Sequence, residues 1–160
     1  MKINFDFRKF YLLVFIFSLG TIAAGVFVQY YYQYEPCPLC IIQRYGFLIL
    51  SIIALIGLIF PKRFIAVFLS IIAIIGVSIA TYQLHMQLFP TPNLSCSNFD
   101  LNYLLDNYTI SQILPKLFKG TGDCQEIHLF IFLPLPAWSL ISYLIIMIGN
   151  IWAFKKIKTS

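Results

Sequence analysis

Charged residues are scarce in this chain. Asp, Glu, Lys and Arg make up 11% of its 160 residues, whereas 60% are hydrophobic and the mean hydropathy is +0.85. A soluble domain contains about 25% charged residues. The composition therefore argues against a soluble globular protein and predicts an integral membrane protein, with residues 1–160 forming one domain.

Several functional motifs are also missing. The sequence contains no phosphate-binding loop, no pair of catalytic carboxylates, no Ser/His/Asp set and no internal repeat. The net charge of +5 is divided among short basic segments, so we expect no nucleic-acid binding. Only one CxxC motif is present, and the other two cysteines lack close partners. This spacing is poor for a zinc site, and we expect no metal.

Four apolar runs have the length of membrane-spanning helices, which need about 20 residues. They predict an all-α membrane protein, a bundle of four transmembrane helices. The expected helices cover about 10–30, 41–60, 64–84 and 137–154. The first run is too long for the core of a signal peptide and is followed by no small-residue cleavage site, so we expect it to remain as a span.

The basic residues predict the orientation of the bundle. Lys116 and Lys119 fall in the long loop, and Arg44 lies at a helix mouth. The other eight fall on the opposite side: Lys2, Arg8, Lys9, Lys62, Arg63, Lys155, Lys156 and Lys158. By the positive-inside rule, both termini are cytoplasmic. Loops 31–40 and 85–136 then face outward, into the periplasm if the membrane is a bacterial inner membrane.

All four cysteines fall outside the apolar runs, on the predicted outer side. They are Cys37, Cys40, Cys96 and Cys124. An even number of cysteines facing an oxidising compartment indicates disulfides. A ring closed within a CxxC motif is too short to remove much chain entropy, so the Cys37–Cys40 pair favours redox chemistry over a structural role.

The residues around the CxxC motif support a reactive dithiol. If Cys37 caps the second helix, Pro38 occupies the first helical position, where its missing N–H costs nothing. The positive end of the helix dipole then favours a thiolate at either cysteine. Arg44 shares a helix face with Cys40 and favours a thiolate there, although snorkelling of Arg44 to the interface is the alternative. The sequence leaves the roles of the two cysteines open.

The long loop carries the other two cysteines on turn-rich sequence. Cys96 follows a proline-rich stretch and is expected on an accessible segment, and Cys124 follows two glycines on a flexible turn. Water-soluble thiols can reach this loop, and a lipid-soluble carrier can reach the mouth of the second helix. We therefore expect electrons to pass from the loop cysteines to the CxxC pair and on to a quinone. His85, at the outer end of the third helix, is a weaker candidate for the carrier site.

Four short motifs, in order along nearly the whole chain, resemble the disulfide bond formation protein B (DsbB) family. They are "CPLCIIQR", "HMQLFPTP", "TGDC" and "LPAW". The resemblance implies a quinone-dependent thiol oxidase of the bacterial inner membrane that reoxidises a periplasmic DsbA-like protein and reduces ubiquinone or menaquinone. It also implies redox disulfides Cys37–Cys40 and Cys96–Cys124.

The resemblance further assigns roles to single residues. Cys96 would form the mixed disulfide with the partner, Cys40 would contact the quinone as a thiolate, and Arg44 would support quinone binding. Two positions depart from the family. Pro38 replaces a branched aliphatic residue, and the family's histidine near the end of the third helix falls on Gln83, two residues before His85.

Two other functions would also use the cysteines of this chain. A membrane redox enzyme like vitamin K epoxide reductase also uses a CxxC motif and loop cysteines, but its CxxC lies late in the chain. A non-enzymatic membrane adaptor would use the cysteines only as structural disulfides.

Overall fold

The computed structural model describes residues 2–34, 36–89 and 124–158. Its four long helices confirm the predicted all-α membrane bundle, because each is long and apolar enough to cross a membrane. They are α1 (Lys2–Tyr32), α2 (Pro38–Ile59), α3 (Arg63–Leu88) and α5 (Leu135–Lys158). A hairpin of two short antiparallel strands, β1 (Leu129–Phe130) and β2 (Leu133–Pro134), comes directly before α5.

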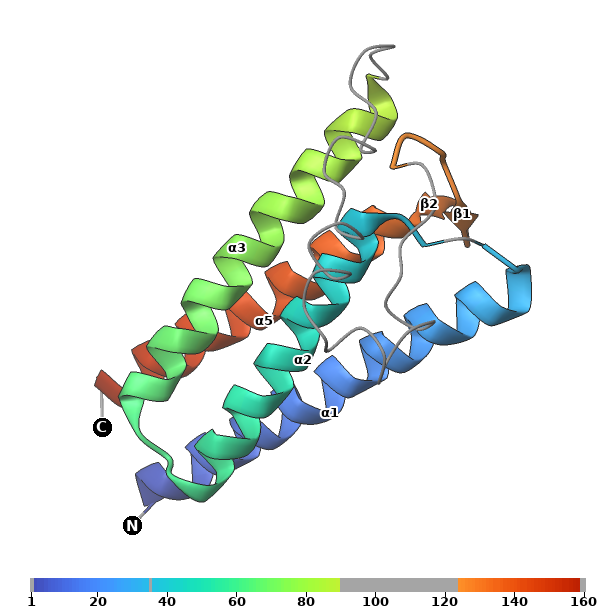
Figure 1. Ribbon diagram of the computed structural model, residues 1–160. Coiled ribbons are helices and arrows are strands. Elements are labelled where there is room, and N and C mark those ends of the chain that lie inside the picture. Colours follow the sequence, from blue (N-terminus) through green and yellow to red (C-terminus); the bar gives the residue numbers. More distant parts are fainter. Residues whose placement is uncertain (1, 35, 90–123, 159–160) are drawn as a thin grey trace, which may run out of the picture.

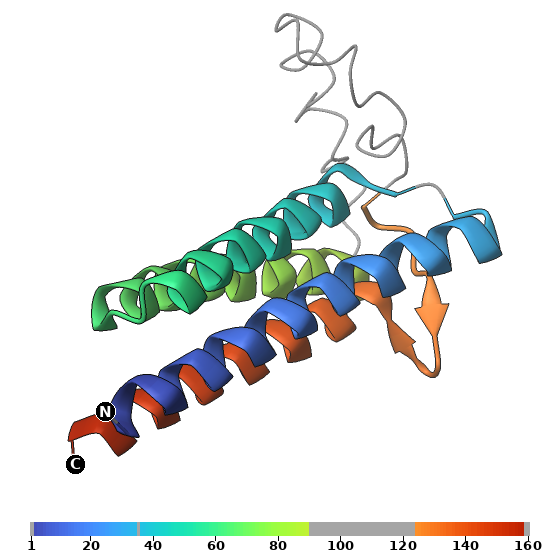
Figure 2. The ribbon, with the colours of Figure 1, turned by 90° about the horizontal axis from the view of Figure 1, so that it is seen from below.

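The helices run along a common long axis (Figure 1). Along the chain, α1 packs on α2, α2 on α3, and α3 on α5. The start of α1, the end of α5 and the turn between α2 and α3 all lie at one end of the bundle (Figures 1 and 2). The basic segments counted above therefore share one end. Which side of the membrane that end faces remains a prediction.

Local sequence explains where α2 begins and ends. Cys37 is its N-cap, with an extended backbone and a sulfur that accepts a hydrogen bond from the Cys40 N–H, and Pro38 occupies the first turn. This confirms the predicted cap. The helix stops before Phe60 and Pro61. The following turn is fixed from α1, because the Tyr11 hydroxyl donates to the Lys62 carbonyl at 3.0 Å.

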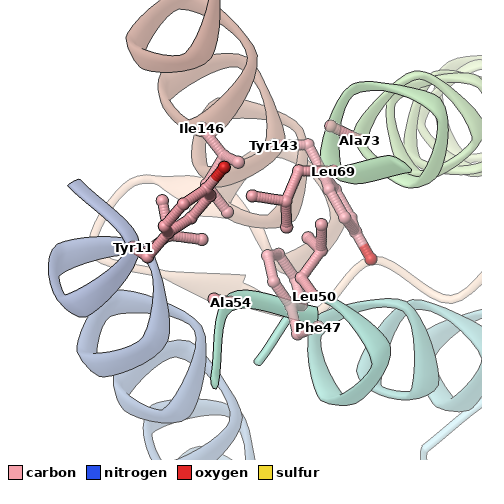
Figure 3. Packing of buried hydrophobic residues seen from close by; sticks show 9 residues of the cluster. Tyr11, Phe47, Leu50, Ala54, Leu69, Ala73, Tyr143 and Ile146 are labelled. Carbon is pink, nitrogen blue, oxygen red and sulfur yellow. The ribbon is translucent and has the colours of Figure 1, made fainter. Parts of the chain in front are cut away.

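Tyr143 of α5 fills the centre of the bundle. Its ring is fully buried and stacks on Phe47 at 4.1 Å with an interplanar angle of 14°, while its hydroxyl donates to the Gln43 carbonyl at 2.8 Å. Figure 3 shows this packing. A Cβ on Gly46 or Gly76 would collide with the Tyr143 ring or hydroxyl. Small residues on α2 and α3 thus let the aromatic ring lie between the helices.

The outward-facing side chains of the spans are apolar. Leu13, Ile16, Ile56, Ile74 and Ile148 are all more than two-fifths exposed. In water such surfaces would be costly, whereas hydrocarbon solvates them. The bundle therefore has a lipid-facing surface around it and places its polar side chains inside.

Gly76→Ala is predicted to destabilise the protein because the added methyl meets the Tyr143 ring. Overpacking of this kind costs about 1–3 kcal/mol. Gly20→Ala is the matched control, because a Cβ there meets nothing within 4 Å and alanine is favoured over glycine in helices by about 0.5–1 kcal/mol. Thermal unfolding of the detergent-solubilised variants, followed by helical circular dichroism, measures both. Equal effects of the two changes would contradict this packing.

Candidate redox site

Cys37 and Cys40 lie side by side at the start of α2. Their sulfurs are 2.9 Å apart, with Cys37 donating to Cys40, whereas the sulfurs of a disulfide are about 2.0 Å apart. The Cys37 side chain is buried and that of Cys40 is partly buried. The pair is therefore present as two thiols in a geometry from which a disulfide needs only a small approach of the sulfurs.

Gln83 of α3 contacts both sulfurs. Its side-chain Nε2 donates to Cys37 Sγ at 3.1 Å and to Cys40 Sγ at 3.0 Å. Its Oε1 accepts a bond from Gln43 Nε2 at 2.7 Å, which fixes the orientation of the amide. Donors aimed at a sulfur favour its negatively charged form. Cys40, which accepts from both Cys37 and Gln83, is therefore the better placed of the two to carry a thiolate.

Cys124 joins this pair from the far end of the long loop. It is fully buried and packs with Cys37 and Met86 in one cluster that Cys40 borders. Cys124 lies in a turn, as expected, but the sequence did not predict that its side chain would be buried. Gln87 helps to hold the segment in place, since its Nε2 donates to the Glu126 carbonyl at 3.0 Å.

The surroundings of Cys37 keep its thiol protonated. Hydrogen bonds with Cys124 and with Cys40, followed by burial, raise the pKa of Cys37 above its usual value. A thiol with a raised pKa is a donor, which agrees with the bond from Cys37 to Cys40. Of the neighbouring cysteines, Cys37 therefore has the sulfur that keeps its proton.

Arg44 lies one helical turn beyond Cys40 and points into the bundle. Its guanidinium donates to Gln29 Oε1 at 2.6 Å and to the Gly25 carbonyl at 3.2 Å, both on α1. These bonds tie the cation to α1, so its side chain is held by the protein and does not extend freely toward the interface. The positive charge remains on the side of α2 that carries Cys40.

A cavity of about 230 Å³ adjoins the cysteines and the arginine. Cys37, Cys40, Arg44 and Gln83 line it, as do Gln29 and Thr21 of α1, Trp138 and Ser142 of α5, and His128 of the loop. An apolar cavity of about 150 Å³ is enough for a benzene ring. The cavity is thus large enough for a substituted ring placed against a dithiol and a cation.

Not every predicted site residue reaches this cavity. His85 is exposed, lies near Phe89 and is not among the residues that line the cavity. Its role in the carrier site stays a prediction, whereas Gln83, one half-turn earlier, lines the cavity. Cys96 lies outside the described residues, so its pairing with Cys124 remains a prediction.

No motif in the sequence assigns a role to the three buried glutamines Gln43, Gln83 and Gln87. Each lies in an apolar helix, where a buried polar side chain is unusual and needs a partner. Amide side chains are rare in membrane spans, so their presence in the sequence could have marked these residues as candidates for the site. Their partners come from elements distant in sequence, however, and only the fold brings them together.

The helices, the thiols and the cavity together define a multi-pass membrane protein with a partly buried dithiol beside a cavity. The sequence matches the family model of "Disulfide bond formation protein DsbB" over residues 7–153. The chain therefore belongs to the DsbB family of membrane proteins that form disulfide bonds, which is an oxidoreductase role.

Relatives named "Disulfide bond formation protein B" support this assignment. The one from Azoarcus sp. (strain BH72) is 37% identical over 142 residues, covering 85% of each chain. The one from Aromatoleum aromaticum is 34% identical over 143 residues, covering 86% of each chain. The one from Hahella chejuensis is 31% identical over 153 residues, covering 92% of each chain. The similarity thus extends over both cysteine-bearing segments.

Gln83→Leu is predicted to slow alkylation of Cys40 in the reduced protein. The change removes an N–H donor, and a hydrogen bond to a charged group contributes about 1.5–3 kcal/mol, so the rate at neutral pH should fall about tenfold or more. Reaction with a maleimide, followed by mass spectrometry of the peptide containing Cys40, measures this rate.

Gln87→Leu is the matched control for this measurement. Gln87 lies one turn further along α3 and donates to a backbone carbonyl, with no bond to either sulfur. Its replacement should leave the alkylation rate of Cys40 nearly unchanged. A similar loss of rate in both variants would mean that Gln83 acts only through the packing of α3.

Proposed function

We propose that this protein is a thiol:quinone oxidoreductase of the bacterial inner membrane. It would reoxidise a periplasmic DsbA-like thioredoxin-fold protein and pass the electrons through its two cysteine pairs to ubiquinone or menaquinone. The observation that carries the proposal is that three cysteines from two distant segments lie together beside a cavity that a partly buried arginine also lines.

The contact between Cys124 and Cys37 supports transfer from the loop to the CxxC pair. Reduction of a Cys96–Cys124 disulfide by the partner's dithiol would leave a thiolate on Cys124. In the next step Cys124 Sγ attacks Cys37 Sγ of a Cys37–Cys40 disulfide. A Cys124–Cys37 bond forms, the Cys37–Cys40 bond breaks, and the electron pair leaves on Cys40. This direction of attack fits the arrangement, because Cys124 borders Cys37 and donors surround Cys40.

The second exchange returns the loop to its oxidised form. The Cys96 thiolate attacks Cys124 Sγ, the loop disulfide forms again, and Cys37 leaves and takes up a proton. The raised pKa of Cys37 favours this protonation. The net result is that the electron pair of the partner's dithiol now resides on the reduced Cys37–Cys40 pair. Cys37 is a thiol, Cys40 is a thiolate, and the partner's second proton has gone to the solvent.

The cavity residues fit a quinone ring. A bound quinone supplies a two-electron oxidant that takes up two protons. The guanidinium of Arg44 has N–H groups beyond the two that bond to α1, and these would serve as hydrogen-bond donors for an oxygen of such a ring. The apolar side chains would cover its faces. The side-chain N–H of Gln83 would stabilise the negative charge on the Cys40 sulfur while the dithiol is oxidised.

The loss of any transferring cysteine is predicted to stop electron flow. Cys40→Ser removes the sulfur next to the cavity, and Cys96→Ser removes the predicted attachment point of the partner. Each variant should lose essentially all reduction of a short-chain quinone by a reduced DsbA-like donor, followed by quinone absorbance.

Ser78→Ala serves as the control for these variants, since Ser78 is exposed and bonds only to its own helix. It should retain normal turnover. Unchanged quinone reduction in both cysteine variants would overturn the proposed function.

Arg44→Ala is predicted to raise the KM for quinone more than the KM for the protein donor. The change removes a cation from the cavity but leaves the loop cysteines in place. Loss of a charged hydrogen bond to the substrate corresponds to about a tenfold or larger rise in KM. Steady-state kinetics with each substrate varied in turn separates the two effects.

Arg44→Lys keeps the charge but loses the two-pronged contact with α1, and it should lie between the wild type and Arg44→Ala. Equal increases in both KM values would indicate that Arg44 anchors α2 to α1 and does not bind the quinone.

A further inference from the structure

The hairpin of β1 and β2 presents an apolar tip that nothing in the described protein covers. All residues from Leu129 to Leu135 are apolar. Ile131 and Phe132 form the turn, and their exposed fractions are 62% and 96%. A phenylalanine exposed to this extent is unfavourable in water, so the tip requires an environment outside the chain.

The turn adopts a backbone conformation that its residues disfavour. The φ angles of Ile131 and Phe132 are 47° and 68°. Two-residue hairpin turns with positive φ at both positions usually contain Asn and Gly, and a β-branched residue at positive φ is an outlier. Strain of this kind is retained where it has a use. Here it directs two large apolar side chains away from the protein.

The base of the hairpin is fixed to the bundle. Trp138 Nε1 donates to the Phe130 carbonyl at 2.8 Å, and the Leu135 N–H donates to the His128 carbonyl at 3.1 Å. The Phe130 ring meets the edge of Tyr32 at the end of α1, with ring centres 6.2 Å apart. The hairpin therefore lies at the level of the last turn of α1, where Tyr30, Tyr31 and Tyr32 are exposed and form an aromatic belt.

The hairpin also points in the direction expected of a membrane contact. Figure 2 shows it extending sideways from the bundle, across the long axis of the helices. It continues without a break into α5, and no charged residue occurs between Leu129 and Phe154. The apolar tip is thus continuous with the lipid-facing surface that α5 presents through Ile141, Ile145 and Ile148.

We propose that this hairpin is an interfacial membrane anchor, with Ile131 and Phe132 inserted among the lipid acyl chains at the cysteine end of the bundle. Lipid is favoured over a protein partner as the occupant because the tip continues the surface that lipid already covers. The anchor would hold the Cys124–His128 segment, which leads directly into β1, at the membrane surface beside the cavity. The inference does not depend on the identity of the electron acceptor.

Tryptophan fluorescence tests the depth of the tip. Phe132→Trp is placed in nanodiscs that contain either ordinary phosphatidylcholine or phosphatidylcholine brominated on its acyl chains. The fluorescence gained over the parent protein, which contributes Trp138 and Trp152, should be strongly quenched by the brominated lipid. It should be several-fold less sensitive to aqueous iodide than that of Glu126→Trp.

Two further variants provide reference signals, one for a side chain in lipid and one for a side chain in water. Ile148→Trp, on the exposed face of α5, gives the response of a lipid-embedded side chain. Glu126→Trp, on a side chain that is 63% exposed in the segment before the hairpin, gives the response of a polar position. A Phe132→Trp signal that follows Glu126→Trp, quenched by iodide but not by bromine, would overturn the proposal.

Cross-linking distinguishes lipid from a protein occupant. Benzoylphenylalanine at position 132, activated by light in native membranes, should give adducts with the mass of a phospholipid. Adducts with a second copy of the chain or with another polypeptide in place of lipid would overturn the proposal.

Discussion

Polar side chains within the four-helix bundle must find their partners inside the protein, because hydrocarbon offers no hydrogen bonds. Gln43, Gln83 and Arg44 all lie in spans that are otherwise apolar. Gln43 bonds to Gln83, Gln83 to the two sulfurs of the CxxC motif, and Arg44 to α1. The same requirement that holds the helices together thus gathers the polar groups around the dithiol.

This arrangement gives the sulfurs a donor that does not change with pH, because the amide of Gln83 carries no titrating proton. The guanidinium of Arg44, which donates to α1, adds a positive charge nearby that is likewise permanent. A histidine in place of Gln83 would donate or accept depending on its tautomer and protonation. Proton gain and loss at the site therefore involve the thiols themselves, with Cys37 retaining its proton as a result of its contacts with Cys124 and Cys40.

Features set by local sequence could be predicted, and those set by distant contacts could not. The four spans follow from the lengths of apolar runs, and the cap at Cys37 follows from Pro38 and the helix start. The burial of Cys124 depends on a contact with α2, whereas the glycines before it predict only a flexible turn. The strands before α5 were not predicted, because their turn at Ile131 and Phe132 lacks the Asn and Gly that mark two-residue hairpins.

The segment that carries Cys124 has to move during the proposed exchange. Cys124 has to border Cys37 in one step and meet Cys96 in another, so its turn must be able to leave the cavity. The described contacts that hold this segment include one bond from Gln87 to a backbone carbonyl and the stacking of His128 on Tyr34 at 4.2 Å. A single hydrogen bond contributes only about 1 kcal/mol, and Gln87 leaves its own buried Oε1 without a partner. A hairpin fixed at the far end of this segment would return Cys124 to the same position after each exchange.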